Sequence, residues 1–166
     1  MIAAVEARIV ILRKAVSFAL IGMVNTLFDA SVFFLAYVFL TTQAGAMTAL
    51  AAFADACQCG TVAIVTLVAA NVFSWFVAVS GSYAMNSYIT FAAESGRKLT
   101  LKSYGAFVAS GILGVIANTV TLVVVAQYAP VWAAKGCAIL VSFVINFSMS
   151  HFVVFRAHTR KTDEAS

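Results

Sequence analysis

Charged side chains are scarce in this 166-residue chain and make up only 10% of it, whereas 63% of the residues are hydrophobic. The ten lysines and arginines fall mostly in clumps, and long apolar stretches fill the intervals between them. A water-soluble helix needs a polar outer face, so these stretches do not fit a soluble globular protein. A helix in lipid satisfies its own backbone hydrogen bonds and exposes apolar side chains all round. The sequence therefore predicts an all-α integral membrane protein.

Motifs for catalysis and energy coupling are missing as well. The chain has no Gly-rich loop with a lysine for nucleotide phosphates, and no catalytic triad, nucleophile elbow or metal-ligand cluster. We therefore expect no enzyme activity, no cofactor and no metal. The net charge of +4 and the pI near 9.2 could suggest nucleic acid binding. However, the basic residues flank apolar runs, as retained loops do, so we expect no nucleic acid partner.

The three cysteines, Cys57, Cys59 and Cys137, have no partner ligands at the spacing of a structural zinc site, and no histidine lies nearby. In the topology predicted below, all three lie near the external side. Two interpretations stay open. Either Cys57 or Cys59 forms a disulfide with Cys137, or the cysteines are free apolar thiols.

Four apolar segments are long enough to cross the ~30 Å hydrocarbon core of a bilayer. They cover about 15–37, 61–85, 103–125 and 133–154 of a single transmembrane domain, 1–166. Nine of the ten basic residues lie in the N-terminal arm, the loop 92–102 and the C-terminal tail. The positive-inside rule then places both termini and the middle loop in the cytoplasm. The tail 158–166 is short and charged, and we expect it to be disordered.

The external connection 41–60 is rich in alanine and small polar residues, with Asp55 as its one charge. It is too weakly apolar for another span, and we expect either a short interfacial helix or a re-entrant turn. The first apolar run is too long for a cleavable signal peptide and has no small-residue cleavage site.

The two halves of the chain resemble each other. In each half, four residues at steps of 4, 3 and 4 share one helical face: Phe18, Gly22, Asn25 and Asp29, and then Phe107, Gly111, Gly114 and Asn118. Two later stretches, 82–91 and 146–155, share Met at the fourth position and Phe at the tenth. The offset is 89 residues for the first helices and 64 for the second. The sequence thus predicts two hairpins of the same membrane orientation, a parallel repeat of the kind that some transporters use.

Polar residues lie inside the predicted spans. Asp29 is about fifteen residues beyond Lys14, or ~22 Å of helix, and so lies near or just beyond the midplane. A carboxylate there costs ~2.5 kcal/mol or more, so we expect Asp29 to face a partner or a wet cavity. Asn25 lies one turn away on the same face. Ordinary helix packing is the favoured interpretation for Gly22, Gly111, Gly114 and Asn118.

The second helix of each hairpin also carries a polar stripe. Its members are Asn71, Trp75, Ala78, Ser82 and Asn86 in the first hairpin, and Lys135, Ser142, Asn146 and Ser150 in the other. Trp75 is equally well explained by ordinary packing. Lys135 lies at the outer end of its helix, where extension of its ammonium to the interface is the default explanation. It could instead neutralise Asp29 or receive an anionic headgroup.

Aromatic residues gather at the cytoplasmic ends of the second and fourth predicted helices. They are expected to form an interfacial belt, and they are Tyr83, Tyr88, Phe91, Phe147, Phe152 and Phe155. Together with Asn86, His151, Arg156, Arg13 and Lys14, this belt could also receive a phosphate and a sugar ring. His151 is equally well explained as a plain interface residue.

These motifs resemble the GtrA family of small four-helix membrane proteins. The family opens with a Phe, then Gly-x-x-Asn-Thr and an Asp, which match Phe18, Gly22, Asn25, Thr26 and Asp29. Its second pattern ends the second and fourth helices, and it matches Asn86, Tyr88, Thr90, Phe91, Asn146, Phe147, His151, Phe152, Val154 and Phe155. The pattern departs at Ser87, where the family usually has a basic residue, and at Ser82 and Ser150, where it has Asn. The resemblance covers about residues 14–156.

The resemblance implies a bacterial inner-membrane protein that moves polyprenyl-phosphate-linked monosaccharides across the membrane for surface-polysaccharide modification. It also implies a membrane-bound glycosyltransferase as a partner. The expected mechanism is a passive flippase, acting as a homodimer, in which the phosphate docks at a basic rim and the sugar enters a polar groove. The expected substrate-binding residues are Arg13, Lys14, His151 and Arg156 at the rim, Asn25, Asp29, Asn86, Asn118 and Asn146 in the groove, and Lys135.

Two other hypotheses remain open at this point. The chain could be a non-transporting accessory subunit that anchors a membrane glycosyltransferase. It could also be a proton-coupled exporter of small cationic compounds with Asp29 as the exchanging carboxylate, although the basic rim disfavours cationic cargo.

Overall fold

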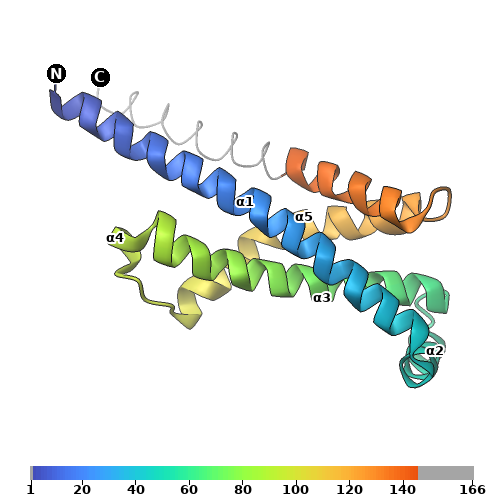
Figure 1. Ribbon diagram of the computed structural model, residues 1–166. Helices are drawn as coiled ribbons and strands as arrows, with labels where there is room; N and C mark the ends of the chain where they lie inside the picture. Colours follow the sequence, from blue (N-terminus) through green and yellow to red (C-terminus); the bar gives the residue numbers. More distant parts are fainter. Residues whose placement is uncertain (1, 146–166) are drawn as a thin grey trace, which may run out of the picture. The chain divides into compact units, whose positions relative to one another are not determined.

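The computed structural model describes residues 2–145, apart from the side chains of residues 2–12, 14, 15, 18, 93 and 94. Every regular element in this part of the chain is helical (Figure 1). The elements are α1 (Ile2–Thr42), α2 (Ala44–Cys57), α3 (Val62–Met85), the π-helix η1 (Asn86–Thr90), α4 (Ala92–Ser95) and α5 (Leu101–Val125). A further helix, Val131–Ile145, follows α5. The prediction of an all-α protein is confirmed.

Within residues 2–145, three helical segments are long and apolar enough to cross a membrane: Ala19–Thr42, Val62–Thr90 and Leu101–Val125. They overlap the first three predicted spans. The second segment is longer than predicted, because η1 continues α3 beyond Met85. The fourth predicted span, 133–154, is described only as far as Ile145, so its full length stays a prediction. The tail 158–166 lies outside the described residues.

Local sequence signals set the start of α3 and the turn before it. The Thr61 hydroxyl accepts a hydrogen bond from the Ile64 N–H at 3.3 Å and so caps the first turn of α3. Before it, Gln58 ends α2 in the left-handed conformation, and Gly60 has a φ of 114° that a side chain would resist. Of the two alternatives for the connection 41–60, the structure contains the short helix.

The chain divides into two compact units, Met1–Ser110 and Gly111–Ser166, and the division falls inside α5. In the first unit α1 and α3 pack antiparallel, and α2 contacts both of them (Figure 1). Phe33 of α1 and Ala70 of α3 are fully buried. Other large apolar residues of α1, such as Leu27 and Leu35, are exposed, as expected for a helix surface that faces lipid.

In the second unit, the later part of α5 packs antiparallel against Val131–Ile145. The Ser142 hydroxyl donates a hydrogen bond to the Gly114 carbonyl oxygen at 3.0 Å. Gly114 and Ala138 are buried, and small residues at a helix contact let two backbones approach closely. The packing role predicted for Gly114 agrees with this contact.

The two hairpins share one register. In the first, Ser74 of α3 donates a hydrogen bond to Asp29 of α1. Adding the offsets of 64 and 89 residues to this pair gives Ala138 and Asn118. The observed pair in the second hairpin, Ser142 and Gly114, lies one helical turn away along the same antiparallel register. The structure therefore supports the repeat, while the membrane orientation of the hairpins stays a prediction.

Replacement of Ala70 by leucine tests the contact between α1 and α3. Ala70 has no exposed surface, so the added methyl groups must displace their neighbours. We expect Ala70→Leu to destabilise the purified protein in detergent by ~1–3 kcal/mol, measured as a lower melting temperature. Val72→Leu, on an exposed position of the same helix, should melt like the wild type. Equal melting of the two variants would show that the helices are loosely packed at Ala70.

Candidate functional site

Asp29 is held at the contact between α1 and α3. Ser74 Oγ donates a hydrogen bond to Asp29 Oδ1 at 2.8 Å, and it also lies 3.0 Å from the Asn71 carbonyl oxygen. Ser74 is fully buried and Asp29 is half-buried. A hydroxyl donor beside the carboxylate reduces the cost of keeping it in apolar surroundings. The prediction that Asp29 faces a partner is confirmed.

Polar residues continue from this pair along both helices toward η1, half-buried on α1 and buried on α3 and η1. On α1 they are 8 and 4 residues apart, and on α3 and η1 they are 8, 4 and 4 residues apart. Residues four apart are neighbours on a helix surface. We call this set the polar seam, and it consists of Ser17, Asn25 and Asp29 with Ser74, Ser82, Asn86 and Thr90. Ser74 was not among the predicted binding residues, although its position three residues after Asn71 places it on the predicted stripe.

Two amide oxygens in the polar seam have no hydrogen-bond partner among the described residues. Asn86 is 4% exposed, and its Nδ2 donates to the Ser82 carbonyl oxygen at 2.9 Å and to Ser82 Oγ at 3.3 Å. Its Oδ1 has no donor, and the buried Oδ1 of Asn25 has none either. A buried acceptor without a donor costs ~1–3 kcal/mol and is uncommon in folded proteins. Both oxygens can therefore accept from a hydroxyl group or a water molecule.

The polar seam ends at η1, where the Ser17 and Thr90 hydroxyls lie 3.0 Å apart. The π-helical turn is closed by the Phe91 N–H, which donates to the Asn86 carbonyl oxygen at 2.8 Å. In this wide turn the neighbouring residues Ile89 and Thr90 both face α1, because Thr90 bonds to Ser17 and Ile89 lines a groove with α1. Short π-helical segments of this kind occur frequently at functional sites.

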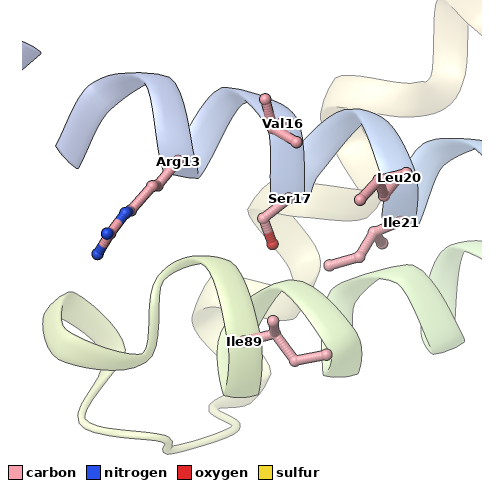
Figure 2. A pocket seen from close by; sticks show the side chains of 6 residues that line it. All are labelled: Arg13, Val16, Ser17, Leu20, Ile21 and Ile89. Atoms are coloured by element: carbon pink, nitrogen blue, oxygen red, sulfur yellow. The ribbon is translucent and has the colours of Figure 1, made fainter. Parts of the chain in front are cut away.

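An open groove of about 530 Å³ lies between α1 and η1 (Figure 2). We call it the Arg13 groove, and it is lined by Arg13, Val16, Ser17, Leu20, Ile21 and Ile89. Figure 2 shows the Arg13 side chain extended at one end, Ile21 reaching from α1 toward the other helix, and Ile89 lying on the facing turn. Arg13 is exposed, and it is the one charged residue among the described side chains that line the groove. One end of the groove can therefore attract an anion, while the rest is apolar.

A second groove of about 320 Å³ lies where the loop before α5 meets α3. There the Tyr83 hydroxyl accepts a hydrogen bond from the Thr100 N–H at 3.0 Å and donates one to the Thr100 carbonyl oxygen at 3.1 Å. The Ser80 and Tyr104 hydroxyls are 2.8 Å apart. These bonds fix the loop to α3. The prediction that Tyr83 belongs to an interfacial belt is wrong, because its ring is buried.

In the second unit, Asn118 is 8% exposed and Lys135 is 1% exposed. An ammonium group that extends to the membrane interface would leave the lysine side chain exposed. The default explanation for Lys135 is therefore wrong, because this side chain lies inside the protein. A buried ammonium group is costly in apolar surroundings unless its charge is compensated.

The structure brings together only some of the predicted binding residues. Asn25, Asp29 and Asn86 lie at different points along the polar seam, and none of the three lines either groove. Arg13 lines the Arg13 groove. Lys14 lies on α1, but its side chain is outside the described part of the structure, as are the whole residues Asn146, His151 and Arg156.

Two further predictions need correction. Gly22 is exposed, and a Cβ at this position would have no neighbour within 4 Å, so no close helix approach depends on it in the described part of the chain. The disulfide joins Cys57 to Cys59, and Cys137 is free and exposed. Both interpretations are therefore wrong for Cys57 and Cys59, which neither bridge to Cys137 nor remain free thiols. Cys137 is a free thiol, as the second interpretation had it. The sequence could not exclude a bridge to Cys137, because residue spacing does not give the distance between cysteines in different segments.

Removal of the Ser74 hydroxyl tests its support of Asp29. We expect Ser74→Ala to lower the free energy of unfolding in detergent by ~1–2 kcal/mol, because a buried carboxylate loses a donor. Ser31→Ala is the matched control, since the exposed Ser31 hydroxyl bonds only to the Leu27 carbonyl oxygen of its own helix at 2.9 Å. If both variants unfold like the wild type, the bond between Ser74 and Asp29 does not contribute to stability.

A comparison with protein families gives a match to the GtrA/DPMS transmembrane domain over residues 17–155. The matched region contains the whole polar seam and both hairpins. Comparisons with curated proteins and with solved structures give no significant match. The family match covers most of the chain and agrees with the helical spans, so this membrane protein belongs to the GtrA/DPMS transmembrane-domain family.

Proposed function

We propose that this protein is a passive flippase that moves a polyprenyl-phosphate-linked monosaccharide across the bacterial inner membrane, with both termini in the cytoplasm. The observation that supports the proposal is the pair of amide oxygens, on Asn25 and Asn86, that find no hydrogen-bond partner among the described residues. A seam that served packing alone would be expected to satisfy its buried acceptors internally. Sugar hydroxyl groups are donors that fit such acceptors.

Asp29 supports the same interpretation. Its carboxylate already accepts a hydrogen bond from the Ser74 hydroxyl at 2.8 Å. A sugar hydroxyl could replace or join this donor, since a carboxylate has room for several donors on its two oxygens. The polar seam would then exchange hydrogen bonds with the sugar and so reduce the cost of moving its hydroxyl groups through lipid.

In this mechanism the phosphate docks first at a basic rim formed by Arg13, Lys14, His151 and Arg156. The sugar then moves past Asn25, Asp29, Asn86, Asn118 and Asn146, with Lys135 as a further contact. Synthesis of the lipid-linked sugar on one side and its consumption on the other set the direction. A four-helix unit is small for enclosing a sugar phosphate, so the active form is a homodimer that works beside a membrane glycosyltransferase.

Reconstitution of the purified chain into liposomes tests this function. The substrate is a polyprenyl phosphoglucose, and the readout is the fraction of glucose that becomes accessible to membrane-impermeant periodate. We expect the wild type to accelerate this exposure. If the purified wild type moves no headgroup while the substrate is intact, the flippase proposal fails and the accessory-subunit hypothesis is favoured.

Changes in the polar seam separate the two hypotheses further. We expect Asn25→Ala and Asp29→Asn each to lower the translocation rate about tenfold, which corresponds to one lost hydrogen bond to a polar group. Gln127→Ala removes an exposed amide outside the seam and should leave the rate unchanged. An accessory subunit predicts that the two seam variants keep full function in cells.

A further inference from the structure

We propose that the Arg13 groove binds the phosphate and the adjoining isoprene units of the lipid carrier. The protein, rather than bulk lipid, would then hold the start of the prenyl chain. The inference rests on the proposed function, because it takes a polyprenyl phosphodiester as the cargo. It adds a defined site for the non-sugar part of that cargo on α1 and η1 (Figure 2).

A hydrogen bond between α1 and η1 holds together the two elements that line the groove. The bond between the Ser17 and Thr90 hydroxyls, 3.0 Å long, ties α1 to η1 at its floor. Arg13, Ser17 and Ile21 follow at steps of four and lie on one face of α1. Ile89 comes from the opposite side, where the π-helical turn points it toward α1. The site therefore depends on two elements that the polar seam already holds together.

The chemistry of the lining matches an amphipathic anion. The volume of about 530 Å³ lies within the ~300–1,000 Å³ of typical small-molecule sites. The apolar part is formed by Val16, Leu20, Ile21 and Ile89, whose branched side chains suit a methyl-branched isoprenoid. A guanidinium group at one end can bind a phosphate oxygen pair with two hydrogen bonds.

The charge of the site suits this carrier. A sugar linked to a prenol through one phosphate is a phosphodiester and carries one negative charge. Among the described residues that line the groove, Arg13 is the charged one, and its guanidinium group can pair with that phosphate.

Lipid binding by the purified full-length protein tests the site. The probe is heptaprenyl phosphoglucose, and its dissociation constant is measured by native mass spectrometry, with phosphatidylglycerol as the competitor. We expect Arg13→Gln to weaken probe binding about tenfold and Arg13→Lys to restore part of it. We expect Leu20→Trp, which fills the apolar part, to weaken binding to a similar extent.

Two variants serve as matched controls. Arg97→Gln removes an exposed cation on the loop between α4 and α5, and Leu27→Trp adds the same indole to an exposed position of α1 outside the groove. Both should bind the probe like the wild type, and melting temperatures establish that all variants are folded. Unchanged binding in Arg13→Gln and Leu20→Trp would overturn the inference, as would competition by phosphatidylglycerol at equal concentration.

The result also separates this inference from the proposed function. If the wild type translocates the sugar while Arg13→Gln and Leu20→Trp bind and translocate normally, the groove assignment fails and the flippase stands. If the wild type binds the probe in an Arg13-dependent way but moves no headgroup, the groove assignment stands and the flippase fails.

Discussion

The contact between α1 and α3 places the carboxylate of Asp29 between two apolar helices, so it depends on a hydrogen-bond donor for that carboxylate. Lipid offers no hydrogen bonds, so each buried polar atom must find its partner inside the protein or in a ligand. Ser74 supplies that partner for one oxygen of Asp29 at 2.8 Å. The same requirement is unmet at Asn25 Oδ1 and Asn86 Oδ1 within the described part of the chain. Stability and function thus draw on the same set of groups, with the satisfied ones holding the helices and the unsatisfied ones open to a ligand.

The π-helical turn at the end of α3 connects the two features that we associate with cargo. Its first residue, Asn86, lies in the polar seam, and its fourth residue, Ile89, lines the Arg13 groove. A regular α-helix has 3.6 residues per turn and would rotate these side chains differently. The extra residue in a π turn shifts the face of the helix that follows it. A local irregularity in the backbone therefore links the site proposed for the sugar to the site proposed for the phosphate.

Much of the fold followed from the sequence, because the physical rules for lipid are strict. Long apolar runs predicted the helices, and steps of four along α1 placed Asn25 and Asp29 on the buried side. The offsets of 89 and 64 residues predicted a repeat whose register the two interhelical bonds support. Periodicity could not reveal contacts that depend on the distance between segments. Three features could not be predicted for this reason: the hydrogen bond from Ser74 to Asp29, the bond between Tyr83 and Thr100, and the burial of Lys135.

The shared register of the hairpins makes their differences informative. When the two copies are aligned by these offsets, Asp29 matches Asn118. In the same alignment Asn71 matches Lys135. Ser74 aligns with Ala138, which has no hydroxyl to offer. At these matching positions the first copy carries the carboxylate of Asp29, and the second carries the ammonium group of Lys135. The two hairpins thus share a helical register and differ in the polar groups that they carry at matching positions.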